Sequence, residues 1–346
     1  MSSSYMGGTT NKVSLTLITH RCCQQLSILH MLQIFVMDYI SPYLPDKLGL
    51  FYYVFVGACV LGALYFNDLL NKVYIYGGGD NKLVHYGYQS DNGPAVWKLY
   101  YTEAGGQRQS PINLSVVSAI NVPSEIRPLQ FSDEFSSQPY DIKIYNTGLN
   151  VTLYANWYGN RRPSLTGGPL DNDIYALLHI KFRWGRYDGE GSEHMIDTRH
   201  FACEMQLAFS KQPMAQQCDV INAARNRVLL MVSYLFMVTP DDNPYLEPLV
   251  SALDYLKLPS SCQPICPFPL KLLAPTFSKN YFYYEGSLTF PPCTEGVIWI
   301  VQSEPLAISH KQIEQFRSLL GCQCAPIATN CRPVQLPNDR DVFYYD

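Results

Sequence analysis

Residues 179–185 read His-Ile-Lys-Phe-Arg-Trp-Gly, and no other stretch of this 346-residue chain says as much about its fold. Polar and charged side chains at 179, 181 and 183 alternate with large apolar ones at 180, 182 and 184. Because successive side chains of a β-strand point to opposite faces, the pattern predicts a strand with Lys181 and Arg183 on one face. The apolar side chains are then expected to enter a core.

Similar alternation recurs on both sides of this strand, which predicts a sheet. The other predicted strands include Asp141–Tyr145, Asn150–Ala155, Glu204–Phe209 and Val297–Gln302. Helical periodicity is confined to short stretches such as Pro248–Leu256 and His310–Leu320. We therefore expect one mostly β domain with short helices over residues 85–346.

The composition narrows the class of protein. The chain has 29 acidic and 25 basic residues, a formal net charge of −4, which argues against nucleic acid as a partner. Charged residues make up 16% of the chain, below the quarter or so that is usual in soluble proteins. These features favour a globular protein associated with a membrane or with the outside of the cell.

An apolar run before this domain predicts whether the chain is anchored in a membrane or secreted. Residues 48–66 carry no charge, and a helix of that length spans roughly 28 Å, close to the thickness of a bilayer core. We interpret the run as a transmembrane signal anchor, with a cleaved signal peptide and a buried core helix as alternatives. The tail 1–47 is then cytosolic, 67–84 is a Gly-containing linker, and the domain is extracellular or lumenal; if the run is cleaved, the protein is secreted.

Cysteine usage agrees with an oxidising compartment. Eight of the eleven cysteines follow the apolar run, an even number that suits disulfides. Two glycosylation sequons begin at Asn113 and Asn150. Zinc binding by Cys262-x3-Cys266 or Cys322-x-Cys324 is less favoured, because neither has the usual two-residue gap.

Six motifs in order identify a family. They are Gly93-Pro94-x-x-Trp97, Arg108-Gln109-Ser110-Pro111-Ile112-Asn113, Asn146-Thr147-Gly148, Gly191-Ser192-Glu193-His194, Gly286-Ser287-Leu288-Thr289-x-Pro291-Pro292 and Arg332-Pro333-Val334-Gln335. From about Tyr86 to the C-terminus the chain resembles the α-carbonic anhydrases. The resemblance implies a large, mainly antiparallel twisted sheet on which the active-site cone opens.

The departures from the family pattern concern its zinc. Family enzymes hold the metal with three histidines, and the matching positions here are Lys181, Arg183 and Gln206. Lys and Arg are cations without a free lone pair at neutral pH, so the resemblance predicts that zinc and every other cofactor are absent. The family's proton-shuttle position is Leu149, and Phe290 stands where a threonine borders the substrate site. We accordingly expect no catalytic residues.

Four residues match the groups that surround the metal in the family, namely Glu193, His194, Glu204 and Thr289. We interpret them as satisfying hydrogen bonds within the fold. Lys181 and Arg183 leave a surplus of positive charge that Glu193 and Glu204 could neutralise, which predicts a closed salt-bridge network in the former cavity. The alternative leaves one cation unpaired, and Lys181 and Arg183 then form an anion site for bicarbonate or sulfate.

The resemblance also bears on disulfides. Extracellular members of the family often join a cysteine before the Arg-Gln-Ser-Pro motif to one just after Pro-Pro. Cys293 matches the second position, but residues 103–106 contain no cysteine, so the partner of Cys293 stays open.

These observations predict a catalytically inactive carbonic anhydrase-related protein that acts as an extracellular binding or adhesion module. Its expected partner is a protein or glycan at the cell surface. The alternative is a weak carbonic anhydrase or esterase with an atypical metal site.

Overall fold

The computed structural model describes residues 86–213, 219–322 and 324–346, which belong to one compact unit. The predicted tail 1–47, apolar run 48–66 and linker 67–84 lie outside the described residues. Within the described part of the chain, none of the helices has the length and apolar character needed to cross a membrane.

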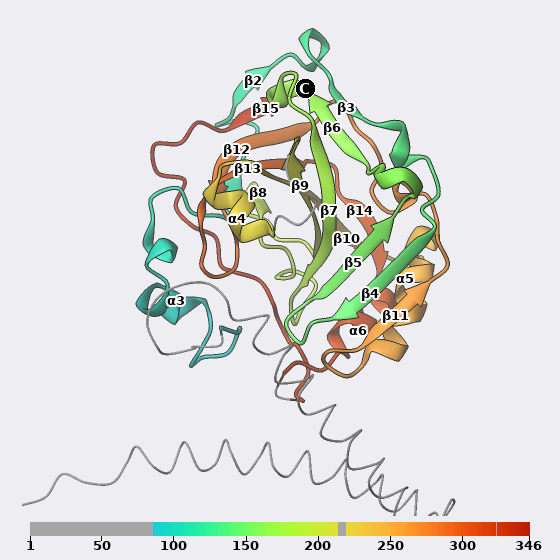
Figure 1. Cartoon of the computed structure of the whole chain (residues 1–346). Helices are drawn as coiled ribbons and strands as arrows, with labels where there is room; N and C mark the ends of the chain where they lie inside the picture. Colours follow the sequence, from blue (N-terminus) through green and yellow to red (C-terminus); the bar gives the residue numbers. More distant parts are fainter. Residues whose placement is uncertain (1–85, 214–218, 323) are drawn as a thin grey trace, which may run out of the picture. The chain divides into compact units, whose positions relative to one another are not determined.

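A 13-stranded sheet makes up most of the domain (Figure 1). Its main path runs β11-β4-β5-β7-β9-β10-β13-β12-β15-β2, while β14 joins β10 and the β3–β6 pair joins β7. A separate pair is formed by β1 and β8. The strands are β1 Asn113–Leu114, β2 Ile120–Val122, β3 Leu129–Phe131, β4 Asp141–Asn146, β5 Val151–Asn156, β6 Ser164–Gly167, β7 Tyr175–Trp184, β8 Met195–Ile196, β9 Cys203–Lys211, β10 Leu229–Thr239, β11 Cys262–Ile265, β12 Tyr281–Ser287, β13 Glu295–Gln302, β14 Leu306–Ser309 and β15 Phe343–Tyr345.

The predicted strands are confirmed, and several are longer than the sequence pattern indicated. Most neighbours in the sheet are antiparallel, as expected. However, β10 runs parallel to both β13 and β14, and β15 runs parallel to β2, so the sheet is mixed. The alternation of side chains is the same in both kinds of pairing, which is why it cannot distinguish them.

The helices are few and short. They are α3 Pro94–Tyr100, α4 Val220–Arg225, α5 Glu247–Leu253 and α6 His310–Arg317. Single 3₁₀ turns are η2 Thr102–Gly105, η3 Ser124–Ile126, η4 Asp133–Phe135, η5 Tyr158–Asn160, η6 Gly168–Leu170, η7 Pro244–Leu246, η8 Asp254–Leu256 and η9 Leu270–Leu272. Helix α6 begins with a capping box in which Ser309 and Gln312 bond each other's backbone N–H groups. The predicted helical stretches are thus confirmed, although α6 ends before Leu320.

The two faces of the sheet bury different clusters. Ile180, Phe182 and Trp184 of β7 enter the larger one, as their alternation predicted. On β10, Met231 and Leu235 belong to a smaller cluster that also contains Trp299. Lys181 and Arg183 of β7 therefore lie on the opposite face from the larger core, and this is the face that carries the site.

Candidate functional site

Two neighbouring strands bring the three predicted zinc-ligand positions together. Strands β7 and β9 pair antiparallel, with Lys181 opposite Gln206 and Arg183 opposite Glu204. The side chains meet diagonally across the pair, where Arg183 Nε donates to Gln206 Oε1 at 3.2 Å. The predicted cluster on this face is therefore present.

Arg183 is buried and bonded to several of its neighbours. Its side chain is only 1% exposed, and Nε lies 3.4 Å from Glu193 Oε2. The group at Nη1 donates to Tyr88 Oη at 2.8 Å and to the carbonyl oxygen of Asn330 at 3.2 Å. Burial is the largest single effect and opposes the charged form of Arg183, but Glu193 together with Tyr88, Tyr86 and Cys331 outweighs it and raises the pKa. Arg183 is thus a permanently charged, paired cation.

Glu204 is the hub of a second set of hydrogen bonds. Its Oε2 accepts from the backbone N–H groups of Glu193 and His194 at 2.7 and 2.8 Å. Its Oε1 lies 2.8 Å from His194 Nδ1 and accepts from Ser233 Oγ at 2.8 Å. Burial alone would raise the pKa of Glu204, but His194 and the hydrogen bonds to the carboxylate lower it to about 2.

Gln206 links the two carboxylates. Its Nε2 donates to Glu193 Oε2 at 2.7 Å and to Glu204 Oε1 at 2.9 Å, while its Oε1 accepts from Arg183. Both ends of the amide are therefore used, and its orientation is set by this network.

Glu193 and His194 are held by the backbone around them. Gly191 lies so close to the carbonyl oxygen of Ala202 that a Cβ there would stand 1.8 Å from it. Glu193 Oε1 accepts from the backbone N–H of Arg332 at 3.0 Å. His194 Nε2 lies 2.7 Å from Tyr284 Oη. Burial raises the pKa of Glu193, while Arg183 opposes that rise.

Thr289 lies at the same cluster, and its Oγ1 accepts from Arg183 Nη2 at 3.4 Å. Its hydroxyl also bonds Glu193 and favours the ionised form of that carboxyl group. Thr289, Glu193, His194 and Glu204 thus use their polar atoms on one another and on the fold.

Lys181 differs from Arg183. Across residues 86–213, 219–322 and 324–346, no hydrogen bond or ion pair reaches its half-buried side chain. Its Nζ instead lies 4.6 Å from the centre of the Phe290 ring. Burial, reinforced by Arg183, lowers the pKa of Lys181 to about 7. The predicted salt-bridge network therefore forms around Arg183 and leaves Lys181 outside it.

The remaining predicted positions border this cluster. Phe290 is buried, and its ring lies beneath both Lys181 and Arg183, the latter at 5.7 Å from the ring centre. Leu149 is half-buried, and its carbonyl oxygen accepts from Asn330 Nδ2 at 3.1 Å. His179 is buried, with its ring centre 5.7 Å from that of Tyr154.

The residues present do not fit the zinc ion that the fold implies. A guanidinium offers no lone pair, and Arg183 is paired with Glu193. The carbonyl oxygen of Gln206 already accepts from Arg183. Of the three positions, this leaves Lys181 alone as a candidate ligand, and one ligand does not make a zinc site. Elsewhere in the described chain, no three His, Cys, Asp or Glu residues gather closely enough to hold a metal ion.

Sequence reasoning missed several members of the network. Tyr88 and Asn330 both contact Arg183, and Tyr284 joins His194 to Ser110 Oγ, which it reaches at 2.9 Å. Asn330 also accepts from the Trp184 backbone N–H at 2.8 Å. Ser233 had a usable signal, since it is polar within the apolar strand β10. Tyr88 and Asn330 had none, because they lie in irregular segments far from β7 along the chain.

Three other predicted positions can be placed. Asn150 is buried and accepts from Thr152 Oγ1 at 2.8 Å, which does not favour a glycan there. Asn113 is half-buried, and its Oδ1 accepts from the Thr198 backbone N–H at 2.8 Å. Cys293 is a buried free thiol that clusters with Trp97 and Ala104.

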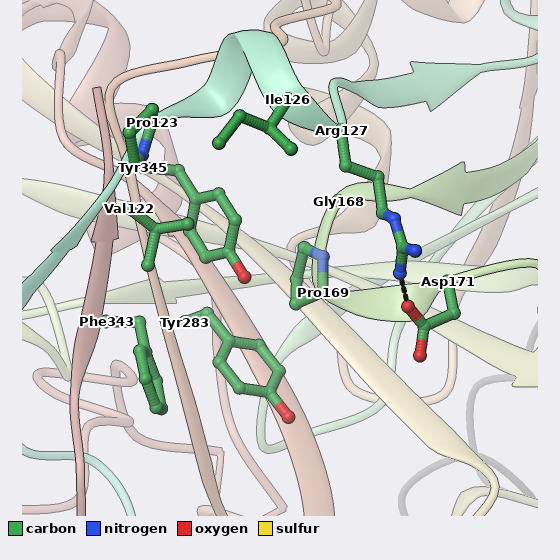
Figure 2. Close-up of a pocket in the computed structure, with 10 residues that line it drawn as sticks. All are labelled: Val122, Pro123, Ile126, Arg127, Gly168, Pro169, Asp171, Tyr283, Phe343 and Tyr345. Carbon is green, nitrogen blue, oxygen red and sulfur yellow. Dashed lines mark ion pairs between the residues drawn. The ribbon is translucent and has the colours of Figure 1, made fainter.

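A separate pocket of about 340 Å³ lies where β12, β15 and β2 meet (Figure 2). Tyr283, Phe343 and Tyr345 line one side of it, and an ion pair between Arg127 and Asp171 lies on the other. It shares no lining residue with the Lys181–Arg183 cluster, and nothing in its lining indicates what would bind there.

Comparison with known proteins establishes the family. Residues 92–346 match the family described as eukaryotic-type carbonic anhydrase. Carbonic anhydrase 7 of Mus musculus and that of Homo sapiens are each 36% identical over 235 residues, which cover 68% of this chain and 86% of the relative. Carbonic anhydrase 1 of Mus musculus is 32% identical over 262 residues, or 74% of this chain and 97% of the relative. The chain belongs to the carbonic anhydrase family.

This result corrects one expectation. The prediction that the chain is not an enzyme is wrong at the level of the family, because the matching relatives are named as carbonic anhydrases. That prediction rested on the residues at three positions, Lys181, Arg183 and Gln206. These substitutions bear on one metal site and not on the whole chemistry of the domain. The membrane or secreted location and the protein or glycan partner stay predictions.

Proposed function

We propose that the site of this carbonic anhydrase-family domain binds a small carboxylate-like anion of the bicarbonate class through Lys181. The observation that carries the proposal is the contrast between two cations on one face of β7. Arg183 is paired with Glu193, whereas Lys181 meets no carboxylate within the described residues. A half-buried ammonium without a partner favours a bound anion, because burying an uncompensated charge is costly.

The charges around Lys181 support this proposal. Two buried arginines, Arg183 and Arg332, and two buried carboxylates, Glu193 and Glu204, belong to this region: Arg183 pairs with Glu193, while the Arg332 guanidinium donates to the carbonyl oxygens of Ser110 and Ala104. Their formal charges, +2 and −2, cancel. The ammonium form of Lys181 is then a surplus charge of +1 that one monovalent anion would balance, and its three N–H groups can donate to that anion.

We propose further that the domain binds this anion without zinc. Arg183 is paired with Glu193, Gln206 uses both ends of its amide inside the network, and a positive metal ion beside the Arg183 guanidinium would add repulsion. The residues of this chain that act on the ligand are Lys181, as the donor, and Phe290, whose ring forms the wall beneath it.

Titration calorimetry on the full chain with formate at pH 6 tests this proposal. Formate is a monovalent carboxylate, and at this pH Lys181 is mostly an ammonium. We expect saturable binding that weakens at least about tenfold in Lys181→Gln, since a hydrogen bond to a charged group contributes about 1.5–3 kcal/mol. The control is Lys211→Gln, because Lys211 is a lysine already paired with a carboxylate, that of Asp173 at 2.6 Å.

Three results would overturn the proposal. The first is a wild-type chain that binds no formate. The second is formate binding that Lys181→Gln leaves unchanged. The third is close to one equivalent of zinc retained by the wild-type chain after dialysis against zinc and removal of the free metal, measured by mass spectrometry.

The family reaction is the second candidate function. The relatives named carbonic anhydrases favour it, as does the intact hydrogen-bonded set of Glu193, Thr289, His194 and Glu204. Carbon dioxide hydration measured on the same sample tests it directly. A rate that Lys181→Gln abolishes and Lys211→Gln spares would support hydration at this site, and a rate no higher than that of buffer would reject it.

A further inference from the structure

Lys181 has the surroundings of a reactive amine rather than those of a salt-bridged lysine. Its Nζ lies over the face of Phe290, a ring that is itself only 8% exposed. Arg183, two residues along the same face, lies over the same ring at 5.7 Å from its centre. We infer that Lys181 is a carbamylation site, at which the side-chain amine binds dissolved carbon dioxide covalently. The inference rests on the anion site proposed above.

The groups facing Lys181 favour the neutral amine. Strand β5 presents Thr152 and β9 presents Gln206, both uncharged. From β7 come the Arg183 cation and His179, whose pKa burial lowers well below its usual range. The carboxylate of Glu193 favours the ammonium but is outweighed by burial and by Arg183, in that order.

The neutral amine is the form that reacts. With a pKa of about 7, roughly nine-tenths of Lys181 is neutral at pH 8. An ordinary lysine, with a pKa of about 10.4, is neutral in only about 0.4% of molecules at that pH. Lys181 therefore has about 200 times more free amine than a surface lysine under the same conditions.

The chemical step balances without any cofactor. The lone pair of Lys181 Nζ attacks the carbon of carbon dioxide, and a nitrogen–carbon bond forms as one carbon–oxygen π bond gives its electrons to oxygen. The nitrogen then releases one proton to water, which leaves an N-carboxylate and a hydronium ion. No atom is oxidised or reduced, and the only co-reactant is carbon dioxide.

The site offers the product one neighbouring cation. Arg183 lies beside Lys181 on the same strand face, and its Nη2 has only one hydrogen bond in the described chain, a long one of 3.4 Å to Thr289. A guanidinium N–H is thus available to a carboxylate formed on Lys181. Carbamylation thus replaces the surplus positive charge of the Lys181 ammonium with a negative charge next to Arg183.

Chemical trapping on the full chain tests this inference. The protein is equilibrated with ¹³C-labelled bicarbonate at pH 8, treated with a trialkyloxonium salt that converts carbamates into stable esters, digested and analysed by mass spectrometry. We expect at least tenfold more labelled ester on Lys181 than on Lys211 in the same molecule. The ester on Lys181 should fall when carbon dioxide is removed, and when the pH is lowered to 6 at a fixed carbon dioxide pressure.

The comparison between two lysines of one wild-type molecule needs no variant, so a folding defect cannot confuse it. Lys181→Arg adds a check, since it keeps a cation but removes the amine and should abolish the labelled ester in that peptide. Equal labelling of Lys181 and Lys211 would overturn the inference. If formate still binds at pH 6 in that case, the proposed anion site stands without carbamylation; if both fail, both proposals are rejected.

Discussion

Replacing Arg183 by Met tests whether the buried ion pair holds the site together. Met fills much of the same volume but removes a guanidinium that reaches Glu193 at 3.4 Å, Tyr88 at 2.8 Å and the Asn330 carbonyl oxygen at 3.2 Å. Glu193 is 0% exposed, so its charge would stay buried without a cationic partner. Breaking a buried pair in this way costs about 3–5 kcal/mol, and we expect Arg183→Met to lower the free energy of unfolding by that amount.

Urea denaturation of the full chain, followed by circular dichroism, measures this loss as a lower transition midpoint with an unchanged slope. The control is Arg127→Ala, which breaks the ion pair with Asp171 between side chains that are 60% and 69% exposed. Such an exposed pair contributes about 0.2–1 kcal/mol. The double variant Arg183→Met, Glu193→Gln should regain part of the loss, because no charge is then left unpaired. A loss for Arg183→Met no larger than that for Arg127→Ala would refute this account of the site.

Three further predictions concern single residues. Lys181→Met should stabilise the protein at pH 6–7 and progressively less as the pH rises toward 10.5, because a lysine whose pKa falls from 10.5 to about 7 on folding binds its proton more readily in the unfolded chain. Urea midpoints of the variant and the wild type at pH 6, 8 and 10 measure this effect. A difference in midpoint that does not depend on pH would contradict the prediction. Glu204→Gln should remove part of the acid sensitivity. The folded pKa of about 2 lies below the usual 4.5, so the stability that Glu204 contributes is present above pH 4.5 and is lost as the pH falls toward 2. Acid titration followed by tryptophan fluorescence should show the variant losing less stability than the wild type over that range. Equal losses would speak against the prediction. Phe290→Ala should expose Lys181 and raise its pKa, since burial is the main cause of the shift. The amount of trapped carbamate, measured as a function of pH, should then have its midpoint at a higher pH than in the wild type. An unchanged midpoint would count against a role for Phe290.

Several elements of the site could be predicted from the sequence because they depend on local periodicity. Lys181 and Arg183 lie on one face of β7, and Glu204 and Gln206 share a face of β9, as their spacing of two residues indicated. The apolar residues between them enter the larger core cluster. The parallel pairing of β10 with β13 and β14 left no such trace, because alternation is the same in either orientation.

The distribution of partners between the two cations could not be predicted in the same way. A closed network around both Lys181 and Arg183 was expected, yet only Arg183 is enclosed. Its partners Tyr88 and Asn330 lie 95 and 147 residues away along the chain, in segments without periodic structure. Their distances from β7 follow from how the whole sheet twists and how the irregular segments cross it.

The amino-acid sequence alone thus suffices for the family, the β architecture and the list of polar residues that share the site. These follow from motif order and from a two-residue repeat, which act over a few residues at a time. Tertiary structure alone makes Arg183 a paired, permanently charged group and places Lys181 over Phe290 without an ion-pair partner among the described residues. Ion pairing and desolvation depend on distances between segments remote in sequence, and those distances exist only once the chain has folded.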